Sequence, residues 1–190
     1  TATELAAGRL VNETFTAFIN PGVTIAAGAG ATALQTFVNG GGRYVGWNAN
    51  GISSARNAGM TNVNTNSISG LNTPGTEFSA TYDTSNPAAW GADLGGWLYR
   101  DSSGNPVIDP ATLTLTTPNN VPTATAVVKY GGEYPASAAN PLRAFGFQVN
   151  GIGTGKLDGR PAVVDQPFGS GHAILIGFNP YYRGWKDQDE

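Results

Sequence analysis

The stretch GGRYVGWNANGISSARNAG, residues 41–59, decides the predicted fold, because it reads as a strand, a sharp turn and a helix in direct succession. Folds that hold a nucleophile at the top of a parallel sheet use this arrangement. The turn contains Trp47, Asn48, Ala49 and Asn50. None of these side chains is a nucleophile, so the stretch has the layout of an active site without a reactive group.

The segments before this stretch continue the same alternation. The spacing of apolar residues predicts a helix over 1–13, a strand over 15–20 and a helix over 31–41, and Pro21-Gly22 stops the strand. Short strands that alternate with helices indicate a parallel sheet with right-handed crossovers. We therefore expect an α/β fold with three layers, in which helices flank a mostly parallel central sheet.

The second half of the chain differs in composition. Residues 60–91 are rich in Thr and Asn and predict a β-rich, loop-rich middle section. Strands are expected over 123–131, 161–168 and 171–180, and the apolar run 173–177 within the last of these predicts burial on both faces. The acidic end of the sequence could begin a helix, so the last helix of the fold is expected to be missing.

Length and composition set limits on the function. The 190 residues suit one domain, and no linker divides them, so 1–190 is expected to be a single domain of a longer protein. Charged residues make up 12%, about half the roughly 25% of an ordinary chain, and uncharged polar residues replace them. This surface composition favours a secreted bacterial protein. The absence of cysteine removes disulfides, thiolate catalysis and cysteine zinc sites.

The distribution of charge argues against two classes of partner. The net charge is −3 and the basic residues are scattered singly, which gives no electrostatic footprint for nucleic acid. No apolar stretch approaches the roughly 20 residues that a membrane span requires. We expect neither nucleic-acid binding nor a membrane span.

The possible catalytic groups are few. His172 is the single histidine and lies at the entry to a predicted strand, where capping or a loop hydrogen bond is a more common role than catalysis. A triad of His172 with Ser53 or Ser54 is disfavoured, because both serines lie inside the predicted helix, beyond the turn. The aspartates are dispersed, and DSSGNPVID, residues 101–109, only partly matches a calcium loop, since the terminal glutamate is absent. Whether Asp101 and Asp109 bind calcium stays open.

Aromatic residues offer a different kind of site. A carbohydrate or peptide platform could be built from Trp47, Trp90, Trp97, Tyr99, Tyr181, Tyr182 and Trp185. Most aromatic side chains instead bury area in a core. The glycine-rich stretches lack the lysine and hydroxyl residues of a phosphate loop, so flexible loops explain them better.

Several segments together resemble a known family. AFINPG, residues 17–22, and LQTFVNGGGRYVGWNANGISSARNAG, residues 34–59, look like the front half of a class I glutamine amidotransferase-like domain. The segment 127–185, with LDGRPAVVD and GSGHAILIGF, is similar to the amidotransferase-like domain found C-terminal to some secreted bacterial zinc carboxypeptidases. The resemblance spans most of residues 15–185. It implies a flavodoxin-like, class I amidotransferase-like fold.

The resemblance also implies that catalysis is lost. The family places a cysteine in a Gly-x-Cys-x-Gly elbow, and aligning Gly46 with its first glycine puts Asn48 at the cysteine and Asn50 at the second glycine. An asparagine amide does not ionise to a nucleophile at neutral pH. The family's His-x-Glu pair is absent, since His172 precedes Ala173 and Ile174, and the zinc ligands of a carboxypeptidase would lie outside this chain.

We therefore expect a non-catalytic accessory domain of a secreted zinc carboxypeptidase-like exoenzyme. It would have no cofactor and no metal, and its partners would be the catalytic domain of the same polypeptide and peptide or cell-wall glycan. The candidate ligand or partner site at the degenerate elbow is Trp47, Asn48, Asn50, Arg56, His172 and Tyr181. Two alternatives remain: a hydrolase with an unrecognised Asp/His site, and a glycan- or protein-binding module that uses exposed aromatics.

Overall fold

The computed structural model describes residues 1–71, 73, 75–92, 95–100, 107–131, 142–146 and 156–180. Within these ranges the helices are α1 (Ala2–Ala6), α2 (Arg9–Asn12), α3 (Ala29–Asn39) and α4 (Asn48–Asn57), with the 3-10 turns η1 (Pro87–Ala89) and η2 (Pro110–Thr112). The strands are β1 (Ala17–Asn20), β2 (Arg43–Trp47), β3 (Thr65–Asn66), β4 (Thr76–Tyr82), β5 (Gly95–Arg100), β6 (Val107–Ile108), β7 (Thr125–Tyr130), β8 (Ala144–Gly146), β9 (Pro161–Phe168) and β10 (Gly171–Ile176).

The main sheet is mixed. Its strands follow the order β1-β2-β10-β9-β7-β4-β5, and β8 pairs with β4. Among the described strands, β1–β2 and β2–β10 are parallel, and the remaining pairs are antiparallel. The prediction of a mostly parallel sheet is therefore wrong. A crossover helix does not join β9 to β10, because Gly169 and Ser170 form a tight hairpin between Phe168 and Gly171.

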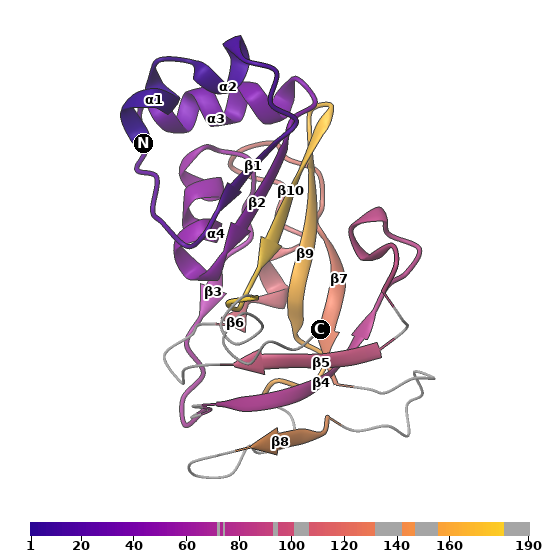
Figure 1. Cartoon of the computed structure of the whole chain (residues 1–190). Helices are drawn as coiled ribbons and strands as arrows, with labels where there is room; N and C mark the ends of the chain where they lie inside the picture. The colour runs from indigo at the N-terminus through magenta and orange to yellow at the C-terminus, as the bar shows by residue number, and fades with distance from the viewer. Residues whose placement is uncertain are drawn as a thin grey trace.

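The sheet bends strongly between its two halves. In Figure 1 the strands β1, β2, β10, β9 and β7 run upright, whereas β4, β5 and β8 cross beneath them. The β7–β9 register shifts at Ala126/Val128 and at Val128/Lys129. Such irregularities increase the local twist and bend a strand, which accounts for the change of direction next to β7.

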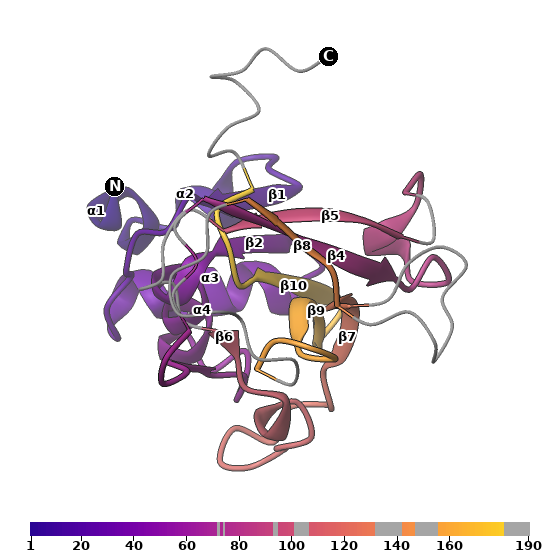
Figure 2. The ribbon, with the colours of Figure 1, turned by 90° about the horizontal axis from the view of Figure 1, so that it is seen from below.

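The described helices gather at one end of the molecule and cover one face of the parallel strands. α3 and α4 contact β2 and β10, while α1 and α2 pack on α3 (Figures 1 and 2). Along β10 the residues alternate between buried and partly exposed, so the predicted burial on both faces is not found. The α/β class is confirmed, but the described residues do not show a third layer. None of their helices is long and apolar enough to cross a membrane.

The predicted N-terminal helix is divided. Gly8 separates α1 from α2 and adopts φ 77°, a left-handed conformation that ends a helix and suits glycine. Thr1 and Glu4 form a capping box at the start of α1. The strand and helix predicted within 41–59 are found as β2 and α4, but α4 begins at Asn48, inside the predicted turn.

Two apolar clusters make up the core of the described residues. The first lies between the helices and the parallel strands and includes Leu34, Tyr44, Ile52 and Leu175, all nearly inaccessible to solvent. The second lies under β4, β5 and β7, where the rings of Phe78 and Tyr130 meet edge to face. The parallel strands and their helices thus have a core of their own, and the predicted elbow belongs to it.

Candidate functional site

The candidate site lies where the parallel strands end. Asn20 of β1 and Leu175 of β10 both align with Gly46 of β2, and Ile176 aligns with Trp47. Open α/β sheets bind ligands at such carboxyl ends. The residue that follows Trp47 is Asn48, the first residue of α4.

Two glycines allow α4 to start directly against β2. A Cβ added at Gly51 would lie 2.7 Å from the carbonyl carbon of Gly46, which is closer than real Cβ contacts. A Cβ added at Gly46 would lie 2.5 Å from the ring of Tyr44. Because no larger residue fits at either position, these glycines determine the sharp strand-to-helix turn.

Asn48 occupies the nucleophile position of this turn. Its φ is 56°, in the left-handed region that asparagine tolerates better than most residues. Its Oδ1 is buried and has no hydrogen-bond partner among the described residues. Buried polar atoms are normally paired, so this unpaired acceptor is an exception within the turn.

A buried polar network supports the turn from beneath. The Asn20 side chain donates to the Tyr44 hydroxyl at 3.0 Å and to Ser54 Oγ at 3.2 Å, and Tyr44 donates to the Gly51 carbonyl at 2.7 Å. Ser54 Oγ also accepts from the Ile25 backbone N–H at 2.8 Å. Burial raises the pKa of Tyr44 to about 12. The hydroxyl therefore remains protonated at neutral pH and acts as a structural donor.

The Pro21–Gly22 turn closes one side of the site. Asn50 donates from its Nδ2 to the carbonyl oxygen of Gly22 at 3.0 Å, and the Asn48 side chain lies against Gly22. Asn20 holds the same turn through reciprocal hydrogen bonds of 2.8 Å with the backbone of Val23. Trp47, Asn48 and Asn50 lie together at this turn because they are almost consecutive in the chain.

Two predicted members lie elsewhere. Arg56 is eight residues beyond Asn48 on α4, about 12 Å along the helix axis, and donates to Asn64 Oδ1 at 3.0 Å. His172 aligns with Arg43 at the amino end of β2, about 13 Å along the strand from Trp47. Tyr181 lies outside the described residues.

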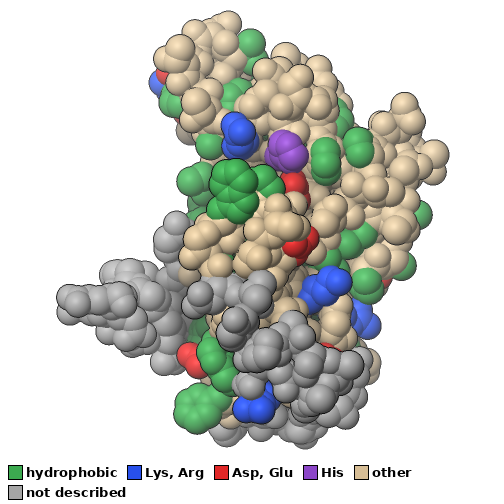
Figure 3. Space-filling view, turned by 90° about the vertical axis from the view of Figure 1, so that its right-hand side faces the viewer, with side chains coloured by type: hydrophobic (Ala, Val, Ile, Leu, Met, Phe, Trp, Pro, Cys, Tyr) green, Lys and Arg blue, Asp and Glu red, His purple; other side chains and the backbone are tan. Residues whose placement is uncertain are grey.

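His172 belongs to a separate polar cluster. Its Nδ1 lies 2.8 Å from Asp165 Oδ1, and the second carboxylate oxygen accepts from Asn86 Nδ2 at 3.1 Å. Figure 3 shows the imidazole on the surface beside a basic side chain. A histidine and a carboxylate therefore meet, but at the opposite end of the strands from Asn48. Ser54 has its own partners around the turn, so the triad of His172 with Ser54 is not formed.

The described residues contain no group of three or more His, Asp or Glu placed to hold a metal ion. The predicted calcium loop lies partly outside the described ranges, since Asp101 is not among them. Asp109 uses both carboxylate oxygens in structural hydrogen bonds, one accepting from the Ala111 N–H at 3.1 Å and the other from Asn66 Nδ2 at 2.7 Å. This is the capping role expected of aspartate in a turn.

Sequence reasoning missed the network beneath the elbow. Asn20, Tyr44 and Ser54 come from three separate elements, and no spacing in the chain links them. The one available signal was Asn20 directly before Pro21-Gly22, because asparagine commonly bonds the backbone of a following turn. Asp165 is one of the dispersed aspartates, and its pairing with His172 depends on the β9–β10 hairpin.

Comparisons with known proteins show the fold and no family. No protein-family model and no curated protein matches the chain. The β-galactosidase from Bacillus circulans sp. alkalophilus matches with a TM-score of 0.53 and 17% identity, over 87% of this chain and 20% of that one. The β-galactosidase from Rahnella sp. R3 matches with a TM-score of 0.50 and 17% identity, over 91% of this chain and 22% of that one.

A ThuA-like protein from Bacteroides uniformis ATCC 8492 matches more weakly, with a TM-score of 0.49 and 12% identity, over 93% of this chain and 65% of that one. This likeness is too distant to establish a shared fold. The chain spans about a fifth of the length of the β-galactosidases. The predicted resemblance to carboxypeptidase-associated domains is wrong, because the matched structures give no link to a carboxypeptidase. What the comparisons establish is a fold that forms part of much longer β-galactosidase chains.

Proposed function

We propose that this chain is a non-catalytic accessory domain of a larger, secreted, carbohydrate-active enzyme. One observation carries the proposal: Asn48 stands at the nucleophile position of an intact elbow. The β-galactosidases that share the fold are about five times longer than the matched region, which suggests the kind of parent enzyme. The secreted location rests on the composition of the sequence.

The elbow lacks the groups that catalysis requires. Acyl transfer needs a nucleophile with a base within about 3 Å, whereas Asn48 presents an amide. His172 is held by Asp165 at the other end of the strands. The other asparagine of the elbow, Asn50, donates a hydrogen bond to the Gly22 carbonyl oxygen. What the elbow retains is shape and one unpaired acceptor, which suits binding or domain packing.

Activity measurements test this proposal. The purified chain is expected to release no product above background from glutamine, from p-nitrophenyl glycosides or from acyl esters. The variants Asn48→Ala and His172→Ala should match the wild type in each assay. Turnover by the wild type that disappears in either variant would show that the domain is an enzyme and would overturn the proposal.

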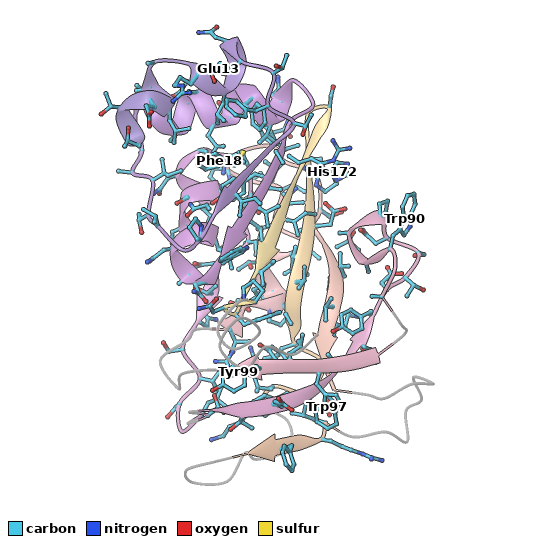
Figure 4. The ribbon with its side chains drawn as sticks, in the orientation of Figure 1. Glu13, Phe18, Trp90, Trp97, Tyr99 and His172 are labelled. Carbon is cyan, nitrogen blue, oxygen red and sulfur yellow. The ribbon has the colours of Figure 1, made fainter. Side chains whose placement is uncertain are left out.

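A second candidate function is glycan binding on the outer face of β4, β5 and β8. Glu77 of β4 lies between Tyr99 of β5 and Phe145 of β8 in one row of the sheet. Trp97 is two residues before Tyr99, so its side chain lies on the same face. Trp97 is 50% exposed and Phe145 is 73% exposed, and Figure 4 shows Trp97 and Tyr99 on neighbouring parts of this sheet.

This surface combines two features that recognise sugars. Flat aromatic rings stack against the C–H face of a pyranose while water is displaced from both. A carboxylate accepts hydrogen bonds from sugar hydroxyls. Glu77 is exposed, so its carboxylate is accessible to a sugar. The face therefore suits a neutral oligosaccharide.

Isothermal titration with galacto-, manno- and N-acetylglucosamine oligosaccharides tests this candidate. Trp97→Ala and Phe145→Ala should each weaken binding at least tenfold, as expected for aromatic anchors. Trp90→Ala is the matched control, because Trp90 is 74% exposed but lies near η1, away from this face (Figure 4). Equal loss of binding in the Trp90 variant, or no binding to any sugar, would contradict the candidate.

A further inference from the structure

A cavity of about 480 Å³ lies between β1 and the N-terminal helices. Its apolar lining comes mainly from Leu5, Leu10, Phe15, Phe18 and Ile25. Figure 4 shows Phe18 beneath the helices, with Glu13 above it at the end of α2. Figure 1 shows that the chain leaving β1 passes outside this strand on its way to α3, so β1 forms the inner wall of the cavity.

β1 is an edge of the main sheet. It pairs with β2 alone. The Arg43 N–H donates to the Thr16 carbonyl, so the backbone groups of alternate residues, Phe18 and Asn20, also face β2. The N–H and C=O groups of Ala17 and Ile19 consequently point toward the open side, and no described residue pairs with them.

β1 itself lacks two of the devices that usually protect an edge strand, a charged side chain and a bulge. Charged side chains, bulges and covering segments normally prevent pairing with another chain. Residues 14–25 contain no charged residue. The charged residues nearby are paired, because Arg9 bonds Glu4 at 2.7 Å and Glu13 at 2.6 Å, and Glu4 and Arg9 line one side of the cavity.

Exposed apolar side chains gather at the same edge. Half of the large exposed apolar side chains in the described residues lie between positions 11 and 23, namely Val11 (52%), Phe15 (46%), Ile19 (56%) and Val23 (61%). Of these, Phe15, Ile19 and Val23 also line the cavity, and exposed apolar side chains next to unpaired backbone groups are typical of an interaction site. β1 and the segment that follows it are uncharged, which favours an uncharged partner.

We propose that this edge binds an extended, uncharged, apolar peptide segment by strand addition to β1. The peptide backbone pairs with the free groups of Ala17 and Ile19, and its alternate side chains enter the cavity beside Phe15 and Phe18. A single extended peptide fits this edge better than a second folded copy of the chain. In a second copy β1 would also lie on the inner wall of its own cavity, where it is not presented for pairing with the first β1. This inference is independent of the accessory role and of the glycan surface.

Fluorescence anisotropy with a labelled Thr-Val-Thr-Val-Thr-Val peptide tests the proposal. The peptide should bind, and the same peptide with N-methyl groups on alternate amides should bind at least tenfold more weakly, because N-methylation removes the backbone donors. Equal binding of the two peptides, or no binding of the first at 1 mM (about 4 kcal/mol of affinity), would overturn the proposal.

Protein variants locate the binding to β1. Ile19→Pro removes the outward N–H, which an edge strand tolerates, and should weaken binding at least tenfold, whereas Ile19→Val should leave it unchanged. Val23→Lys places a charge at the rim and should also weaken binding without altering the strand, which covers the case in which Ile19→Pro fails to fold. Sedimentation of the free wild type should show a monomer. A dimer that Ile19→Pro dissociates would instead assign the edge to a second copy.

Discussion

The Tyr44 hydroxyl donates a hydrogen bond of 2.7 Å to the carbonyl oxygen of Gly51 and thereby joins β2 to the first turns of α4. The same hydroxyl accepts from Asn20 at 3.0 Å, which adds the end of β1 to the connection. None of these bonds involves the side chain at position 48. The elbow can therefore keep its shape when its nucleophile is absent.

Tyr44→Phe tests this connection. The variant removes the two buried hydrogen bonds that join the Tyr44 hydroxyl to the Gly51 carbonyl and to Asn20, and this loss lowers the free energy of unfolding by about 1–3 kcal/mol. Urea unfolding followed by circular dichroism measures the change. Tyr82→Phe is the control, because no hydrogen bond of the Tyr82 hydroxyl is present in the described structure, and it should change stability by less than about 0.5 kcal/mol.

The pH dependence of stability follows from the same tyrosine. Burial raises the pKa of Tyr44 from 10.0 to about 12, so between these values the folded state binds more protons than the unfolded state. Stability is then fully present below pH 10 and falls as the pH rises toward 12, by roughly 3 kcal/mol at most.

Urea unfolding at pH 9, 10, 11 and 12 measures this decline. Tyr44→Phe should show a flatter profile than the wild type above pH 10. Burial also raises the pKa of Tyr82, so a smaller decline should remain in that variant. Identical slopes for Tyr44→Phe and the wild type would show that Tyr44 does not control alkaline unfolding.

Gly51→Ala tests the close approach of α4 to β2. The added methyl would lie 2.7 Å from the Gly46 backbone, and overpacking of this kind destabilises by about 1–3 kcal/mol. Gly40→Ala is the matched control, since its nearest contact would be an ordinary 3.4 Å. Thermal unfolding should show a lower midpoint for Gly51→Ala only. A neutral Gly51 variant would mean that the turn can move apart.

The sequence predicted the elbow because every determinant of its shape is local. Gly46, the turn and the helix that follows are adjacent in the chain, and the glycines needed for close packing can be identified directly in the sequence. The pairing of β9 with β10 was also accessible, because Gly169-Ser170 between two apolar runs is a hairpin signal. Treating these runs as successive parallel strands produced the error in the sheet.

The rest of the site depends on contacts between distant segments. His172 was predicted at the entry to a strand and was included as a neighbour of Asn48, whereas the register of β10 against β2 places it opposite Arg43, at the other end of the strands. Arg56 follows Asn48 in sequence, but a helix carries it about 12 Å away. Register and helix length, which a single sequence leaves open, decide which candidates meet.

Asn48→Gly tests whether the elbow asparagine is kept for binding rather than for stability. Glycine adopts φ 56° without strain and removes the buried, unpaired Oδ1, so the variant should be as stable as the wild type or more stable by up to about 1 kcal/mol. Asn50→Gly is the control, because it deletes the 3.0 Å hydrogen bond to Gly22 and should be destabilising. Urea unfolding measures both. A large loss of stability in Asn48→Gly would show that this side chain has a structural partner, and the elbow acceptor would then not be available to a ligand.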